Sequence, residues 1–341
     1  MSRLFPLIRA VWYILTLRQW RWMVTARMRL RAAGPPSLSQ VVNYKMAFDR
    51  NPFLKVAADK LATRDYLASQ VGQEYLPPLV FASTDADTII SRLPLGNFVL
   101  KPNNSSGSIL IVSETVRDSH PLSASELLSR GAMICHPRNI VYEELRSVCS
   151  EWLARRYEWR PGIRAIEWAY EGVPTKLMVE ELLLDQHLRL PSDYKFHVIA
   201  GRVEFINVMS RYQDNKSPTS SSSTVQSTLL ARDWRPMPVA KEDWRHHQVP
   251  VEVPTRSTEM VELAEYLGTA SDYLRVDMYS VDGSPFIGEL TPYPNAGRHK
   301  FRPRSFSRQV VRRWAPTYGP RARFTRRRGD FGVKRRRQAK K

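Results

Sequence analysis

The sequence LRVDMYSVDGSPFIGELTPYPNAG at residues 274–297 predicts a β-hairpin with acidic side chains on both strands. Because side chains alternate along a strand, Arg275 and Asp277 share one face of the first strand. By the same alternation, Glu289 and Thr291 share one face of the second strand. What these side chains can do together depends on the register that the turn imposes.

The turn of this hairpin leaves two registers open. A two-residue turn at 282–283 would pair Asp277 with Gly288 and put Glu289 on the far face. A three-residue loop at 282–284 would set Asp277 opposite Glu289, where the two carboxylates repel each other. A divalent cation removes this repulsion, and Mg²⁺ prefers oxygen ligands together with phosphate. The alternative is a salt-bridged hairpin in which the arginine at position 275 neutralises both acids.

A strand–loop–strand pattern, VLKPNNSSGSILIV, occupies residues 99–112. Its first strand delivers Lys101 to a polar loop at 102–108. Backbone N–H groups near glycine and serine can approach phosphate oxygens closely, and the lysine adds compact positive charge. An ordinary turn between two strands is the alternative.

Charged residues also lie on two later strands. At MVEELL, residues 178–183, a strand ends with the acids Glu180, Glu181 and, just beyond, Asp185, where a linker between two lobes could run. In DYKFHVIAGRVEF at residues 193–205, Lys195 shares a strand face with Asp193. The alternative for both segments is a solvated strand face.

The net charge of +19 is concentrated at the two ends of the chain. Residues 1–32 carry seven arginines and no acid, and residues 321–341 carry eleven Lys or Arg against one acid. The near-neutral middle argues against a basic nucleic-acid-binding core. We expect residues 4–30 to form a basic amphipathic helix, lying on an anionic membrane or packed on the body. We expect the tail after Tyr318 to be disordered when unbound.

The number of cysteines and the length of the apolar segments indicate in which cellular compartment the protein is expected. Cys135 and Cys149 are the only cysteines, too few for a disulfide framework or a Cys-rich zinc site. The apolar run at 5–17 is interrupted by Arg9 and is too short to span a bilayer. It also lacks a small-residue cleavage site, so we expect no signal peptide and a cytoplasmic protein.

Taken in order, DKLATRDYL, VLKPNNSSG, VEELL, DYKFHVIAGRVEF and RVDMY…GELTPYP resemble the ATP-grasp superfamily. More closely, these segments look like the TupA-like family, which is associated with teichuronopeptide and other cell-surface polysaccharide biosynthesis. The resemblance covers about residues 45–305. Five motifs in the family's order are a stronger signal than any one of them.

The resemblance implies an ATP site. Lys101 and Lys195 would contact the phosphates, as would Arg64 in the DKLATRDYL run. The flexible loop closing over them would comprise Asn104, Ser105, Ser106 and Gly107. The backbone that reads adenine would comprise Glu180, Glu181 and Leu182. Asp185 is the implied ribose ligand.

The resemblance also implies a catalytic magnesium site. Asp277 and Glu289 match the Mg²⁺ ligands. Arg275 matches the residue that steadies the transferring phosphoryl group, and Lys195 is its catalytic partner. Many ATP-grasp enzymes have Glu-x-Asn at the second metal site. Here Thr291 stands in place of the asparagine, and Asn295 is a substitute ligand four residues later.

The implied fold is α+β: an ATP-grasp fold of two lobes, each with an antiparallel sheet, enclosing ATP. The expected units are a basic amphipathic helical segment at 1–44, an N-terminal subdomain at 45–95, a central lid subdomain with the phosphate loop at 96–182, a C-terminal catalytic subdomain at 183–315, and a basic disordered tail at 316–341.

The expected function is Mg²⁺-ATP-dependent ligation of a carboxylate, activated as an acyl phosphate, to an amine or similar nucleophile. The expected substrate is an acidic polymer or a carboxylate-bearing small molecule in cell-surface polymer synthesis. The basic ends would allow peripheral contact with the inner face of an anionic membrane, and no specific nucleic acid is expected. The alternatives are an ATP-binding scaffold without activity and a nucleic-acid-binding protein that uses the Arg-rich tail.

Overall fold

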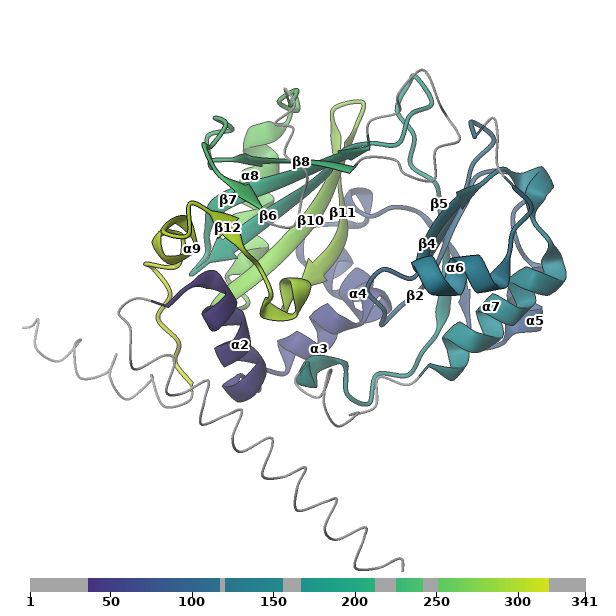
Figure 1. Ribbon diagram of the computed structural model, residues 1–341, viewed down its shortest axis with the longest axis horizontal. Coiled ribbons are helices and arrows are strands. Elements are labelled where there is room, and N and C mark those ends of the chain that lie inside the picture. Colours follow the sequence, from purple (N-terminus) through teal and green to yellow (C-terminus); the bar gives the residue numbers. More distant parts are fainter. Residues whose placement is uncertain (1–35, 117–119, 156–166, 212–224, 242–250, 319–341) are drawn as a thin grey trace, which may run out of the picture.

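The computed structural model describes residues 36–116, 120–155, 167–211, 225–241 and 251–318 (Figure 1). Two five-stranded sheets lie on either side of two helices, α3 and α4. The predicted N-terminal basic helix and the predicted disordered tail lie outside the described residues. In the described part of the chain, no helix is both long and apolar enough to cross a membrane.

The first sheet has the strand order β1-β5-β2-β3-β4. Its strands are β1 (Leu79–Ser83), β2 (Phe98–Pro102), β3 (Ile109–Val112), β4 (Ala132–Cys135) and β5 (Leu177–Glu181). One face is covered by α5 (Ala86–Ser91), α6 (Ala124–Arg130) and α7 (Tyr142–Ala154). Phe98 and Leu100 are fully buried in this core. Alternation along β2 therefore leaves Lys101 on the opposite face.

The second sheet has the order β11-β10-β6-β7-β8 and is antiparallel throughout. Its strands are β6 (Asp193–Ile199), β7 (Arg202–Arg211), β8 (Val225–Leu230), β10 (Tyr273–Val281) and β11 (Ser284–Thr291). One face packs on α8 (Ser257–Gly268), where Phe196, Val198, Leu274 and Val276 are buried. The residues between them, including Lys195, Arg275 and Asp277, therefore lie on the other face, called the site face below.

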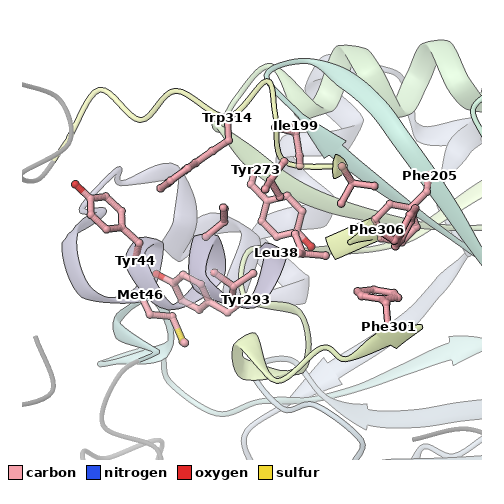
Figure 2. Packing of buried hydrophobic residues seen from close by; sticks show 14 of the residues in the cluster. Leu38, Tyr44, Met46, Ile199, Phe205, Tyr273, Tyr293, Phe301, Phe306 and Trp314 are labelled. Carbon is pink, nitrogen blue, oxygen red and sulfur yellow. The ribbon is translucent and has the colours of Figure 1, made fainter. Parts of the chain in front are cut away.

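Part of the site face is closed by helix α2 (Leu38–Phe48) and the C-terminal segment. Figure 2 shows the aromatic cluster that joins them to Phe205 and Tyr273 of the sheet. The segment contains β12 (Phe301–Arg302), paired with β9 (Ala240–Lys241), and α9 (Phe306–Gln309). The ammonium of Lys45 is buried here between Asp49 at 2.5 Å and Asp272 at 2.7 Å.

Two helices lie between the sheets, α3 (Phe53–Ala58) and α4 (Lys60–Gln70). Asp59 caps α4 by accepting from the backbone N–H groups of Leu61 and Ala62. The first residue of α4 also donates its backbone N–H to Asn103 O, at 2.9 Å. The helix is thereby fixed to the loop that follows β2.

Three observations bear on the predicted organisation, whose domain boundaries stay a prediction. Strand β1 pairs with β5, so the expected boundary between 45–95 and 96–182 cuts through one sheet. The expected boundary at residue 44 falls inside α2, whose two ends share one core. The first sheet is also not wholly antiparallel, because β4 runs parallel to β3 after the α6 crossover.

Candidate active site

The β10–β11 hairpin combines the two registers that the sequence left open. Val281 pairs with Ser284, so the turn is the two-residue one, and both of its residues have positive φ, 49° and 84°. Near the site, however, Asp277 pairs with Glu289. One extra residue, Gly288, forms a β-bulge between these two stretches and restores the pairing of the carboxylates.

Gly288 is required by its surroundings. A Cβ atom at this position would lie 2.7 Å from Cε2 of Tyr279. The tyrosine ring therefore packs directly on the glycine backbone, and any Cβ there would force the ring or the strand to shift.

Asp277 is the centre of a buried charge cluster on the site face. The Nε of Arg275 lies 2.6 Å from Asp277 Oδ1, and its Nη2 lies 2.6 Å from Oδ2. Lys195 Nζ lies 2.8 Å from the same Oδ2 and also binds Asp193. Burial alone would raise the pKa of Asp277, but the charges of Arg275 and Lys195 hold it below its ordinary value.

Glu289 lies at the edge of the same cluster. Its Oε2 is 3.7 Å from Arg275 Nη2. The hydroxyl of Thr291 accepts from the same guanidinium nitrogen at 3.0 Å. The salt-bridged hairpin considered from the sequence is therefore present, with Arg275 adjoining both acids. Asn295, the other expected metal ligand, is exposed in the 3₁₀ turn Pro294–Gly297, which packs near α2.

A second charge cluster lies on the first sheet. Lys101 Nζ is 2.5 Å from Glu180 Oε2, and Arg64 Nη1 is 3.0 Å from Glu180 Oε1. All three side chains are at most 13% exposed. The structure thus brings Arg64 and Lys101 together around the carboxylate of Glu180, a residue that was expected to contribute only its backbone.

The loop after β2 is held by its two asparagines. Asn103 Nδ2 donates to Asp59 Oδ1 at 2.8 Å. Asn104 Nδ2 donates to Val173 O and Thr175 Oγ1, both at 3.0 Å. The side chain of Asn104 therefore anchors the loop, while Ser106 and Gly107 are exposed at its tip, with Ser105 beside them half-buried.

Lys60, which was not among the predicted site residues, connects the two clusters. Its Nζ donates to Ser105 O at 2.6 Å and lies 3.5 Å from Glu289 Oε1. Burial lowers the pKa of Lys60; Glu289 opposes this shift, and the nearby charge of Lys101 adds to it. The lysine of the DK pair in DKLATRDYL is the signal that could have identified it.

Tyr279 shows how near the clusters lie to each other. Burial, the largest cause, raises the pKa of its hydroxyl well above 10. The charges of Asp193, Asp277, Glu180 and Glu289 raise it further. Carboxylates of both sheets therefore lie near enough to act on a single side chain on β10.

The predicted adenine and ribose residues lie at the end of β5. Glu181 is exposed, and its backbone N–H donates to Pro78 O at 3.0 Å. Leu182 follows directly and is half-buried. Asp185 organises a turn by accepting from the backbone of His187 and Arg189 at 2.9 Å each. The structure does not bring Asp185 into either charge cluster.

The acidic pair suits a hard cation better than a soft one. The described residues contain no group of three His, Cys, Asp or Glu that could hold a metal ion. Asp277 and Glu289 nevertheless face each other from neighbouring strands, and both offer carboxylate oxygens as metal ligands. Mg²⁺ is commonly bound by one or two carboxylates plus substrate phosphates, so these residues fit it.

Comparison with known proteins identifies the family. Residues 129–311 match the model described as TupA-like ATPgrasp, more than half of the chain, and the chain belongs to this family. The predicted family is thus confirmed, as is the α+β class with two sheets. No curated protein matches the sequence.

Several solved structures resemble the chain at low identity. D-alanine–D-alanine ligase from Bacillus anthracis is 14% identical, with a TM-score of 0.40 over 80% of this chain and 69% of that one. L-amino acid ligase from Bacillus licheniformis is 14% identical, with a TM-score of 0.40 over 81% and 55%. The ATP-grasp ligase PsnB is 11% identical, with a TM-score of 0.35 over 71% and 54%. The chain spans only about half the length of PsnB.

Proposed function

We propose that this protein is an ATP-dependent ligase that activates a carboxylate as an acyl phosphate and joins it to an amine or similar nucleophile. The observation that carries the proposal is the pair of charge clusters described above, one on each sheet. Lys60, Lys195 and Arg275 lie beside the facing carboxylates Asp277 and Glu289 of the second sheet. Lys101 adds a fourth cation, paired with Glu180 of the first sheet. Such a site complements the negative charge of a transferring phosphoryl group.

Each side chain of the site has a role in this reaction. Lys101, Arg64 and Lys195 would hold the ATP phosphates beneath the loop at 104–107. Arg275 would steady the phosphoryl group during transfer. The backbone at 180–182 would read adenine, with Asp185 near the ribose.

The reaction proceeds in two balanced steps. A carboxylate oxygen of the acid attacks the γ-phosphorus of ATP; the bond to the bridging oxygen breaks, and ADP leaves with the electron pair. The amine then attacks the carbonyl carbon of the acyl phosphate. Inorganic phosphate leaves, and the nitrogen loses a proton. No side-chain nucleophile is needed, which agrees with the residues of the site.

Asp277 and Glu289 would hold Mg²⁺, with Thr291 and Asn295 as candidate ligands of a second ion. When bound, Mg²⁺ offsets charge on the phosphate oxygens. Arg275 and Lys195 now contact Asp277 directly, so they already stand where phosphate oxygens need positive charge.

The acid substrate belongs, in this proposal, to the synthesis of a cell-surface polymer. The basic ends would hold a cytoplasmic enzyme near anionic lipid or an acidic polymer. Deletion of residues 1–32 or 321–341 should reduce binding to vesicles containing anionic lipid. Unchanged binding by both truncated proteins would contradict this part of the proposal.

The test for catalysis is ADP release from Mg²⁺-ATP in the presence of a panel of amino acids and sugar acids. Lys101→Ala and Asp277→Asn should each lower turnover by about 100-fold or more, because the first removes a positive charge that would hold the phosphates and the second removes a carboxylate that would hold Mg²⁺. Lys55→Ala and Asp233→Asn are matched controls outside the two charge clusters. Nucleotide binding without ADP release for any acid would favour an inactive scaffold. Salt-sensitive binding of random DNA by the tail, without ATP affinity in the body, would favour a nucleic-acid-binding protein.

A further inference from the structure

One buried polar side chain on the site face has no role in the site described above. Asn207 on β7 is fully buried, and Ser227 Oγ on β8 donates to its Oδ1 at 2.6 Å. The amide nitrogen Nδ2 is also buried and has no hydrogen-bond partner among the described residues. Because a serine hydroxyl can donate or accept, turning the amide over would still leave one end unpaired.

An unpaired donor at this depth costs folding free energy, and buried polar groups in proteins are almost always paired. An apolar side chain of similar size would remove that cost. The amide is therefore better explained by a ligand than by the fold.

The sheet register places Asn207 in line with the catalytic groups. Glu289 pairs with Asp277, Asp277 with Lys195, and Lys195 with Asn207. These four residues form one row across four neighbouring strands. Because adjacent strands are about 4.8 Å apart, Asn207 lies one strand beyond Lys195 and about 10 Å from Asp277. The row leads from the acidic pair, past the phosphate-binding lysine, to the unpaired amide.

A second unpaired atom lies beside this row. Asp193, two residues before Lys195 on the same face of β6, binds Lys195 through Oδ2. Its Oδ1 is buried and has no hydrogen-bond partner in the described part of the chain. The unpaired acceptor, Asp193 Oδ1 on β6, thus lies on the strand next to the unpaired donor, Asn207 Nδ2 on β7.

We propose that Asp193 and Asn207 form a subsite for the acid substrate, holding the part that extends from the carboxyl group; this rests on the proposed ligase function. Asn207 Nδ2 requires an acceptor oxygen, and Asp193 Oδ1 requires an O–H or N–H donor. A hydroxyl group supplies both. The class of substrate is therefore a hydroxylated carboxylic acid. A plain aliphatic acid leaves both protein atoms unpaired, and sites built for a hydrogen bond reject such analogues strongly.

The test compares three six-carbon acids, gluconate, glucuronate and hexanoate, in Mg²⁺-ATP-dependent ADP release and in calorimetric binding to the ATP-loaded full-length protein. Gluconate or glucuronate should bind and stimulate ADP release, and hexanoate should not. In Asn207→Leu, the KM for the hydroxylated acid should rise by about tenfold or more, with the KM for ATP unchanged. Asn207→Asp keeps the shape and the bond from Ser227 but replaces the donor by an acceptor, so it should show the same loss even if the leucine variant folds poorly.

Three results would overturn the subsite: equal KM values in wild type and both variants, hexanoate as effective as gluconate, or neither hydroxylated acid binding nor stimulating ADP release. Ser227→Ala serves as a graded variant. It leaves Nδ2 in place but removes the hydroxyl that orients it, so a smaller rise in KM is expected. Failure of the ligase proposal is recognised separately, because ATP would then neither bind nor turn over in the wild type.

Discussion

Asp277 on β10 lies directly opposite Glu289 on β11, although the two-residue turn joining these strands would by itself place Gly288 there. The bulge at Gly288 supplies the one-residue shift, and the ring of Tyr279 packs over it. Because a one-residue slip moves a side chain to the other face of a sheet, the position of Glu289 depends on this glycine.

Substitution of Gly288 should therefore damage both stability and activity. In Gly288→Val the new side chain meets the Tyr279 ring, and relief of the clash shifts the strand. We expect a loss of about 1–3 kcal/mol in the free energy of unfolding, measured by urea denaturation. ATP turnover should fall together with it. Gly96→Ala is the matched control, because the nearest atom to its Cβ would be Glu114 Oε1 at an ordinary 3.7 Å. Equal stability of the two variants would argue against the packing of Tyr279 on Gly288.

Glu180 neutralises two of the cations that would bind ATP. Glu180→Gln leaves Lys101 and Arg64 without their buried counter-ion, which destabilises the free protein by about 3 kcal/mol or more. Bound phosphates would restore that negative charge. The rise in melting temperature on adding Mg²⁺-ATP should therefore be larger in Glu180→Gln than in the wild type. Thermal denaturation with and without Mg²⁺-ATP measures this rise. A rise in Glu180→Gln that is equal to or smaller than that in the wild type would show that the phosphates do not reach these cations.

Lys60 joins the phosphate loop to the acidic hairpin. Lys60→Met keeps much of the apolar stem but removes the ammonium bonded to Ser105 O and close to Glu289. We expect the KM for ATP to rise by about tenfold, because a charge-assisted contact of this kind contributes roughly 1.5–3 kcal/mol. Steady-state kinetics at several ATP concentrations measures this. Lys55→Met is the matched control, since Lys55 is exposed and contacts Glu171 O instead. An unchanged KM in Lys60→Met would remove Lys60 from the nucleotide site.

The two cysteines should make stability fall at alkaline pH. Burial raises the pKa of Cys135 to about 11 and that of Cys149 to about 12. The unfolded chain releases these protons near pH 9, so the folded state binds more protons between pH 9 and these values, and its stability decreases as pH rises through that window. At pH 10 each thiol should account for about 1 kcal/mol of lost stability.

Urea denaturation at pH 7 and pH 10 measures this difference, and Cys135→Ala/Cys149→Ala should reduce it. The same burial predicts that neither thiol of the folded protein reacts with a thiol reagent at pH 8, whereas both react in denaturant. Fast labelling of the native protein would contradict the burial of these side chains.

Much of this site follows from local sequence patterns. Strand alternation was sufficient to place Arg275 beside Asp277 on one face and to deliver Lys101 from the end of β2. The bulge was not predictable in this way, because it depends on a ring packing across the hairpin and not on the turn residues. The Asp-Gly turn predicted a register that is correct at the turn and wrong at the site.

The contacts that sequence reasoning missed all join segments distant in the chain. Lys60 meets Ser105 and Glu289, which lie 45 and more than 200 residues away. Glu180 points its side chain at Lys101 only because β5 inserts between β1 and β2. Asn207 has an ordinary strand context, and only its burial without a partner distinguishes it. Contacts between residues so far apart in the chain cannot be predicted from the local periodicity of the sequence.

The aromatic cluster between α2 and the C-terminal segment joins the two described segments that lie next to the charged ends of the chain. The backbone N–H of Leu38 donates to Ser307 Oγ at 3.0 Å, and Tyr44 Oη donates to Tyr318 O at 3.1 Å. Six residue positions, about 9 Å of helix, separate Leu38 from Tyr44, so Ser307 and Tyr318 contact α2 within two turns of each other. Residues 1–32 and 321–341, which carry seventeen of the nineteen net positive charges, adjoin described segments that share this one core. If both ends bind an anionic surface, as proposed, each would raise the effective concentration of the other there, and removal of either one should weaken attachment by more than its share of the charge.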